Sequence, residues 1–99
     1  MNKRRFILED YPGNYAMSCE TAHDAALFLE VLDRNEKTWK YGLSYLDVIN
    51  FGEFKDDTVY FFNEGTYDHI NVAYEQGYKV LEFNDFDWSC YTNRDEENT

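Results

Sequence analysis

The sequence predicts an α+β domain, in which one main helix packs on one face of a small antiparallel sheet. Three observations favour this fold class: one amphipathic helical pattern early in the chain, strand-like patterns in most of the remainder, and no regular alternation of helices with strands. A chain of 99 residues has the size of one domain and can bury a core without metals or disulfides. We therefore expect one domain over residues 1–91 and a polar acidic tail over residues 92–99.

The first two strands are expected to form a hairpin. Residues 5–8 can form a strand, and residues 15–19 alternate well enough to form a second one. The segment 11–14, Tyr-Pro-Gly-Asn, is typical of a turn, because proline fixes φ and glycine or asparagine accepts the following positions.

The main helix is predicted to begin after Thr21. The Thr21 side chain can cap the first turn, with Asp24 three residues later in a variant of the capping box. Asn35 is a plausible residue for the end of the helix. Apolar residues at helical spacing give one stripe that can face the sheet, formed by Ala25, Phe28, Leu29 and Leu32.

The rest of the chain is predicted to consist mostly of strands. Residues 58–62 and 79–83 are rich in β-branched and aromatic residues, and residues 66–70 can pair back as a further strand. Residues 71–76 are expected to form a turn or a single helical turn that Gly77 ends.

Residues 36–57 have no regular pattern. We expect Trp39 to lie on a short strand just after the helix and residues 51–57 to form a loop. Long irregular loops in small domains are often functional. Seven tyrosines of the second half of the chain suit either an interface or the half-buried rim of a thin sheet: Tyr41, Tyr45, Tyr60, Tyr67, Tyr74, Tyr78 and Tyr91.

The composition combines strong acidity with many aromatic residues. The chain has 20 acidic and 9 basic residues, a net charge of −11, and 19% of its residues are aromatic. Acidic chains with few aromatics tend to be disordered, whereas this chain has enough aromatics to build a core. Its surface should repel nucleic acid and anionic lipid and suit a partner with a basic surface.

The charge is unevenly distributed along the chain. Residues 6–99 hold 6 basic and 20 acidic residues, a net charge of −14. With one phosphate charge per ~1.7 Å of duplex axis, this charge corresponds to about 24 Å of duplex. The comparison has meaning for binding only if the carboxylates share a face; spread evenly, they would aid solubility alone.

Acidic and aromatic residues are interleaved near the end of the domain. If strand geometry continues past Phe83, neither face of the segment is purely apolar, so at least one aromatic side chain should be exposed. Exposed aromatics beside carboxylates suit a protein interface; the alternative is a final strand followed by a solvated turn. The candidate partner-binding residues are Asp56, Asp57, Glu82, Asp85, Asp87 and Trp88.

The residues give no indication of catalysis, of a cofactor or of a metal site. Cys19 and Cys90 are isolated, and we expect both thiols to be reduced and structural. The two histidines, His23 and His69, carry no nucleophile signature. The aspartate pairs 56–57 and 85/87 could together offer oxygen ligands to a divalent cation, but no calcium-loop pattern is present and a solvated loop is favoured.

We expect a cytoplasmic protein that does not associate with membranes. No apolar run approaches the ~20 residues that a transmembrane helix needs. The apolar residues 6–8 are followed at once by two acidic residues, which is too short for a signal peptide.

Residues 20–87 resemble a loose group of small, mostly uncharacterised proteins encoded by bacteriophages and prophages, chiefly of low-GC Gram-positive hosts. Four short motifs, in this order, carry the resemblance: Phe28-Leu29-x-x-Leu32, Trp39-x-x-Gly42, Thr58-Val59-Tyr60-Phe61 and Gly77-Tyr78-Lys79-Val80-Leu81-Glu82-Phe83-Asn84-Asp85-Phe86. The group has no catalytic residues to transfer. The resemblance implies a phage context, in which small acidic proteins often inhibit CRISPR nucleases, restriction enzymes or repair enzymes, several by placing carboxylates where the target expects phosphates.

Three hypotheses for function follow. The first is a non-enzymatic inhibitor that docks on a basic, nucleic-acid-binding surface of a host defence protein, most concretely an anti-CRISPR protein that acts on an effector nuclease. The second is a sponge that sequesters a nucleotide signal of host defence, with tyrosine or tryptophan stacked on the base. The third is a phage accessory protein without an inhibitory role, whose acidity serves solubility.

Overall fold

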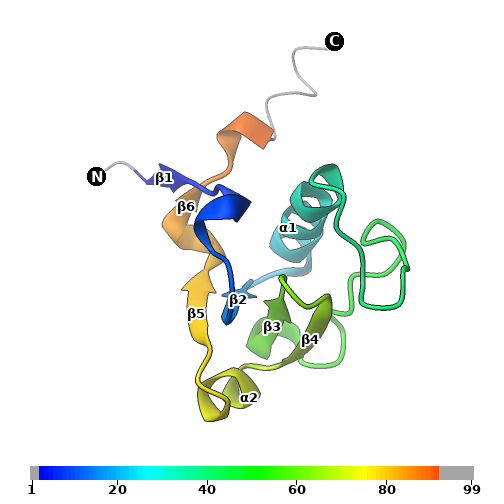
Figure 1. Ribbon diagram of the computed structural model, residues 1–99, viewed down its shortest axis with the longest axis vertical. Helices are drawn as coiled ribbons and strands as arrows, with labels where there is room; N and C mark the ends of the chain where they lie inside the picture. Colours follow the sequence, from blue (N-terminus) through cyan, green and yellow to red (C-terminus); the bar gives the residue numbers. More distant parts are fainter. Residues whose placement is uncertain (1–2, 92–99) are drawn as a thin grey trace.

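The structure is a computed structural model that describes residues 3–91; the expected tail, residues 92–99, lies outside the described residues. The α+β class is confirmed, with the main helix α1 (Ala22–Arg34) beside a four-stranded sheet (Figure 1). The sheet has the strand order β4-β3-β2-β5, and these strands are Thr66–His69, Thr58–Phe61, Tyr15–Ser18 and Lys79–Glu82. The remaining elements are short: β1 (Arg4–Arg5), β6 (Phe86–Asp87), α2 (Ile70–Glu75), and the 3-10 helices η1 (Leu8–Asp10), η2 (Lys55–Asp57) and η3 (Phe83–Asp85).

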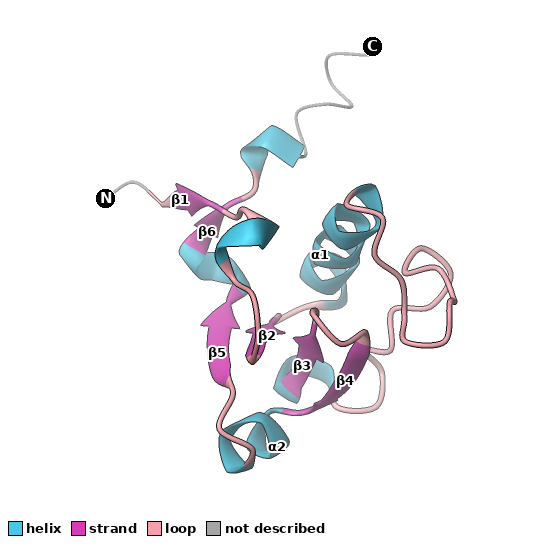
Figure 2. Cartoon of the chain, viewed as in Figure 1, coloured by secondary structure: helices cyan, strands magenta, loops and turns pink. Residues whose placement is uncertain are grey.

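The four-stranded sheet is mixed rather than wholly antiparallel. Neighbouring pairs β2–β3 and β3–β4 are antiparallel as expected, but β5 lies parallel to β2. The reason is α2, which occupies residues predicted to form a turn or one helical turn. A turn would fold the chain back beside β4, whereas the chain passes through α2 (Figure 2) and continues as β5 at the other edge of the sheet, where it lies parallel to β2.

The predicted N-terminal hairpin is wrong. Arg4 and Arg5 pair in parallel with Phe86 and Asp87 near the other end of the chain, and η1 follows them. Tyr15–Ser18 is a strand, but its partners are β3 and β5. The apolar residue Phe6 explains the difference, because its fully buried side chain needs the aromatic core near α1 rather than a neighbour across a two-stranded ribbon.

Helix α1 follows its sequence signals closely. The Asp24 backbone N–H donates to the Thr21 hydroxyl at 3.0 Å, and the helix ends at Asn35, whose side-chain amide donates to the carbonyl of Val31. Capping of this kind stabilises a helix by about 1 kcal/mol. All four residues of the predicted stripe are buried, and so is Val31: the buried residues are Ala25, Phe28, Leu29, Val31 and Leu32.

The sheet buries apolar side chains on both of its faces. Met17 points to the α1 side and belongs to the larger core, while Ala16 points to the other side. There Ala73 of α2 packs with Val59 and Phe61 in a second, smaller cluster. Because successive strand residues face opposite ways, both clusters use the same strands.

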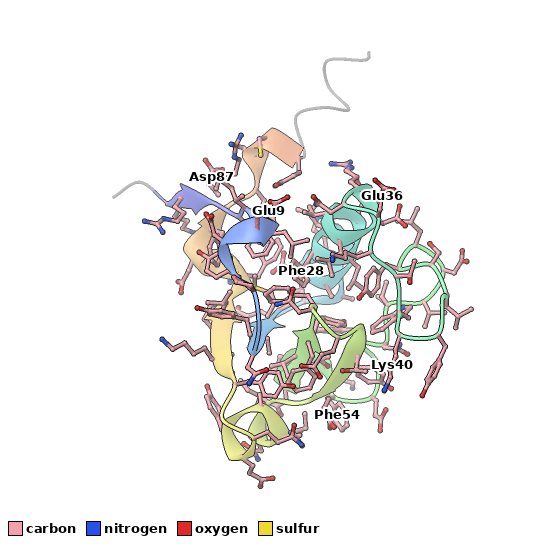
Figure 3. The ribbon with its side chains drawn as sticks, viewed as in Figure 1. Glu9, Phe28, Glu36, Lys40, Phe54 and Asp87 are labelled. Atoms are coloured by element: carbon pink, nitrogen blue, oxygen red, sulfur yellow. The ribbon has the colours of Figure 1, made fainter. Side chains whose placement is uncertain are left out.

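Aromatic side chains join the two ends of the described chain to α1. The ring of Phe6 contacts those of Phe28, Phe86 and Trp88 at centroid distances of 5.4–5.7 Å. Trp88 also stacks on Phe83 at 4.4 Å. Figure 3 places Phe28 in the interior, between the N-terminal segment and the axis of α1. The terminal segments are therefore part of the core rather than additions to its edge.

The loop between α1 and η2, residues 35–54, contains no strand, so the predicted strand at Trp39 is wrong. The Trp39 indole N–H instead donates to the carbonyl of Val48 at 2.8 Å, across the loop. The Tyr60 hydroxyl of β3 donates to the carbonyl of Ile49 at 2.7 Å. The first bond closes the loop on itself, and the second attaches it to the sheet without a ladder of backbone pairs. We call residues 35–54 the connecting loop.

Truncation of Phe6 tests whether the N-terminal segment belongs to the core. Phe6→Ala should lower the free energy of unfolding by about 3–5 kcal/mol, the usual cost of removing a buried phenyl ring. The adjacent Ile7 is 38% exposed, so Ile7→Ala should cost about 1 kcal/mol or less. Urea unfolding followed by circular dichroism measures both. Equal, small losses for the two variants would contradict the described role of Phe6.

Candidate acidic docking site

Four carboxylates gather where β2 and β5 end. Because the two strands are parallel, with Ser18 opposite Glu82, both strands end at the same end of the sheet. We call the carboxylates there the acidic sheet end, and they are Glu20 after β2, Asp24 in the first turn of α1, Glu82 at the end of β5, and Asp85 in η3.

The acidic sheet end carries unrelieved electrostatic repulsion. Partial burial, followed by the nearby Asp85 and Glu20 carboxylates, raises the pKa of Glu82 above its ordinary value. Burial also raises the pKa of the Cys19 thiol, with further contributions from Asp24 and Glu82, so this thiol is protonated at neutral pH. Ionisable groups that shift one another's pKa values in this way lie close together, between a few ångströms and one Debye length apart.

Asp56 and Asp57 end η2, directly before β3, and thus lie at the same end of the sheet, but toward its other edge. In one row across the sheet, Glu82, Ser18, Val59 and Asp68 are successive partners. At ~4.8 Å between strands, the backbones of Glu82 and Asp68 are about 14 Å apart. The predicted aspartate pair is therefore near the acidic sheet end without being part of its cluster.

Asp57 has a local partner of its own. Its Oδ2 atom lies 3.6 Å from Nε2 of His69, and Nδ1 of His69 accepts a hydrogen bond from the Asn71 backbone N–H at 3.1 Å. Since Nδ1 accepts, a neutral imidazole carries its proton on Nε2 and directs it toward the carboxylate. This contact attaches η2 to the beginning of α2.

Asp87 lies in a different electrostatic environment from the acidic sheet end. Its backbone lies beside that of Arg5 in the β1–β6 pair. The pKa of its carboxyl is lowered by hydrogen bonds with Ser89, one of them from the backbone N–H at 2.9 Å, and by the positive charge of Lys3. Figure 3 shows Asp87 at the end of the molecule where β1 lies. Here carboxylate and basic side chains balance locally, which separates Asp87 from the acidic sheet end.

The prediction that at least one aromatic side chain of this segment is exposed is wrong. Trp88 is 7% exposed, and its indole N–H donates to the carbonyl of Phe83 at 2.7 Å. Phe83 and Phe86 are buried as well. The segment departs from strand geometry at η3, and this departure turns all three rings inward while Asp85 stays exposed.

The cysteines and histidines do not form one constellation. Cys19 is buried, Cys90 is exposed, and both thiols are free. Cys19 follows β2 and His69 ends β4, and β3 lies between these strands. Over residues 3–91, no three histidine, cysteine or acidic side chains are grouped so that they could hold a metal ion.

A second surface feature, which the sequence did not single out, lies on the connecting loop. A pocket of about 290 Å³ opens where this loop meets β4, lined by Trp39, Lys40, Tyr41, Leu43, Asn50, Gly65, Thr66 and Tyr67. Tyr41 is 90% exposed, and Leu46, farther along the loop, is 61% exposed. The only signal in the sequence was a run of apolar residues that fits neither helix nor strand periodicity.

No protein-family model, curated protein or solved structure matches the chain. The phage resemblance thus stays a prediction. Within residues 3–91, no helix is both long and apolar enough to cross a membrane.

Gly65 is required where β4 begins beside the connecting loop. Its φ is +75°, and a Cβ there would lie 2.7 Å from the Lys40 nitrogen and 2.9 Å from the Thr38 carbonyl oxygen. Gly65→Ala should therefore cost about 2–4 kcal/mol of unfolding free energy, because left-handed strain and a backbone clash add together.

The matched control is Gly42→Ala. Its φ is +93°, but no atom lies within 4 Å of the added Cβ, so left-handed strain alone should cost about 1–2 kcal/mol. Thermal or urea unfolding separates the two variants. A loss at Gly65 no larger than that at Gly42 would show that the loop can move away freely.

Glu82→Gln tests the repulsion at the acidic sheet end. A carboxyl group whose pKa is raised by folding opposes folding when it is ionised and stops doing so when it is protonated. The variant should thus be more stable than the wild type near pH 7, by less than ~1 kcal/mol for so exposed a group, and the difference should vanish near pH 3. Urea unfolding at both pH values measures it. If the wild type is instead more stable than the variant near pH 7, the repulsion is refuted. The control is Glu75→Gln, on α2.

Proposed function

We propose that the protein is a non-enzymatic inhibitor that binds a basic, nucleic-acid-binding surface of a host defence protein through its acidic sheet end. The observation that carries the proposal is the parallel pairing of β2 and β5, which brings Glu82 to the same end of the sheet as Glu20, with Asp85 following in η3. Burial, and after it the Asp85 and Glu20 carboxylates, raises the pKa of Glu82 there. The chain's net charge of −11 has the sign that such a partner would attract.

The repulsion within the acidic sheet end favours a cationic partner. Burial and the neighbouring Asp85 and Glu20 carboxylates disfavour the ionised form of Glu82, and an arginine or lysine placed beside it lowers that cost. Isolated surface pairs contribute about 0–1 kcal/mol, whereas desolvated interface pairs contribute several times more. A fixed group of carboxylates also resembles consecutive phosphates in charge, which is the property that a nucleic-acid-binding surface recognises.

The proposed set of contact residues differs from the set predicted from the sequence. Glu82 and Asp85 remain at the centre, and Glu20 joins them because it lies at the end of the neighbouring strand. Asp56 and Asp57 become flanking contacts near the other edge of the sheet. Asp87 is left out because basic residues accompany it, and Trp88 is left out because its ring is buried.

The most concrete partner is a CRISPR effector nuclease in the cytoplasm of a bacterial host. Its guide–target channel is basic over many ångströms and binds backbone phosphates without reading their sequence. The resemblance to small phage proteins supports the same context.

Charge reversal with a matched control tests the proposal. Glu82→Lys/Asp85→Lys should weaken capture of a guide-loaded CRISPR effector nuclease by about 2–5 kcal/mol if the two carboxylates are desolvated in the complex. It should also restore target-DNA cleavage that the wild type inhibits. Asp47→Lys/Glu75→Lys changes the net charge equally, on exposed residues of the connecting loop and α2, and should leave capture and inhibition nearly unchanged.

Two further measurements decide the mode of binding. Capture by the wild type should be lost at high salt and should be competed by duplex DNA, since both reduce attraction to a basic groove. Equal losses in the two double variants would show that net charge, not this site, governs binding. Failure to capture or inhibit effector nucleases at low salt would remove them as partners, and failure with restriction and repair enzymes as well would overturn the proposal.

A further inference from the structure

The pocket on the connecting loop differs in charge from the rest of the protein. The chain carries 20 acidic residues, yet no carboxylate lines this pocket, and its one charged lining residue is Lys40. The Lys40 ammonium lies 5.7 Å from the centre of the Tyr41 ring, at the exposed side of the pocket. Figure 3 shows Lys40 at the opposite side of the molecule from Asp87. Lys40 therefore offers an anion one cation at this pocket, while the carboxylate that contacts its lining, Glu53, is already bonded by the Tyr67 hydroxyl.

The walls of the pocket present ring surfaces rather than hydrogen-bonding groups. Trp39 uses its indole N–H for the carbonyl of Val48, and the Tyr67 hydroxyl bonds the Glu53 carboxylate at 2.9 Å. The two rings contact each other edge to face at 5.9 Å. With its polar atoms engaged inside the protein, each side chain leaves carbon surface for a ligand, and flat carbon surface is best covered by another ring.

The pocket is formed before any ligand enters it. The Lys40 backbone N–H donates to the carbonyl of Gly65 at 2.9 Å, and the Trp39 N–H donates to that of Leu43 at 3.0 Å. The close approach at Gly65 leaves no room for a Cβ, which fixes the distance between the loop and β4. A preformed site needs little ordering on binding, so even a small ligand can bind measurably.

The size of the pocket limits its occupant. Its volume of about 290 Å³ lies at the lower limit of the ~300–1,000 Å³ typical of ligand sites. One ring system with a short substituent fits this volume. Asn50 and Thr66 add an amide and a hydroxyl to the lining, which can orient a polar substituent.

We infer that this pocket binds one planar aromatic ring that carries a single anionic group beside it, with the ring against Trp39, Tyr41 and Tyr67 and the anion at Lys40. Two sources share this chemistry: an aromatic carboxylate and a nucleoside monophosphate. Nucleotides with several phosphates are disfavoured, because Lys40 is the one cation among the lining residues. The inference stands independently of the acidic sheet end, which lies on other elements.

Titration of the ¹⁵N-labelled protein with three probes tests the inference. Indole-3-acetate and adenosine monophosphate each combine an aromatic ring with an anionic group. Tryptamine has the same ring as indole-3-acetate but carries a positive charge. At least one anionic probe should shift the Trp39 indole N–H and the amides of Gly65, Thr66 and Tyr67, with a Kd of about 10 mM or tighter. Tryptamine should bind several-fold more weakly. The tighter of the two anions identifies the source.

Two variants with matched controls assign the roles. Lys40→Gln should lower the affinity for the anionic probe about 2- to 5-fold, as expected for the loss of an exposed ion pair. It should not lower the affinity for tryptamine. Tyr41→Ala should lower the affinity for the same probe about 2- to 10-fold, because a ring contact is lost. Lys79→Gln on β5 and Tyr74→Ala on α2 remove exposed side chains of the same kinds elsewhere and should change nothing.

The inference is overturned if neither anion shifts these signals at about 10 mM, or if tryptamine binds as tightly as the anions. It is also overturned if Lys40→Gln and Lys79→Gln have equal effects. Both test side chains are exposed, so the variants should keep the wild-type amide spectrum away from the pocket, and this spectrum verifies that they are folded.

Discussion

The stacking of Phe6 on Trp88 is the contact on which the arrangement of the domain depends. The two rings come from opposite ends of the described chain and meet over Phe28 of α1, with centroid distances of 5.4 Å between each other and 5.9 Å from Trp88 to Phe28. A domain of this size has few large side chains to bury, so a group of packed aromatics supplies much of its hydrophobic stabilisation. The Tyr91 hydroxyl, which donates to the Phe6 carbonyl at 2.9 Å, adds a polar bond to the same junction.

The inward turn of these rings also determines which groups remain outside. Once Phe83, Phe86 and Trp88 are committed to the core, the residues between them face solvent, and Asp85 is among them. The crossover through α2 then brings the end of β5 beside the end of β2, which places Glu82 next to Glu20. The acidic sheet end is thus a product of two tertiary features, the burial of these rings against distant residues and the pairing of β5 with β2.

This origin explains how far the sequence could predict the structure. Local signals were sufficient for α1, because Thr21, Asn35 and the apolar stripe act over one or two turns, and they located β3, β4 and β5 to within one residue. They failed where the partner is distant in the chain: Arg4–Arg5 against Phe86–Asp87, and β5 against β2. For the proposed site, the sequence singled out Glu82 and Asp85 because acidic and aromatic residues are interleaved there. It could not exclude Asp87 or Trp88, since only tertiary contacts reveal a neighbouring basic strand or a buried indole.

The pairing of β1 with β6 also constrains the order in which the protein can form during synthesis. The first described strand has its partner more than 80 residues later, and contacts of such separation carry the largest loop-closure entropy in the chain. While the ribosome makes the intervening residues, Phe6 has neither Phe86 nor Trp88 to cover it. This part of the core therefore closes only after Phe86 and Trp88 have been made, rather than progressively as the chain grows.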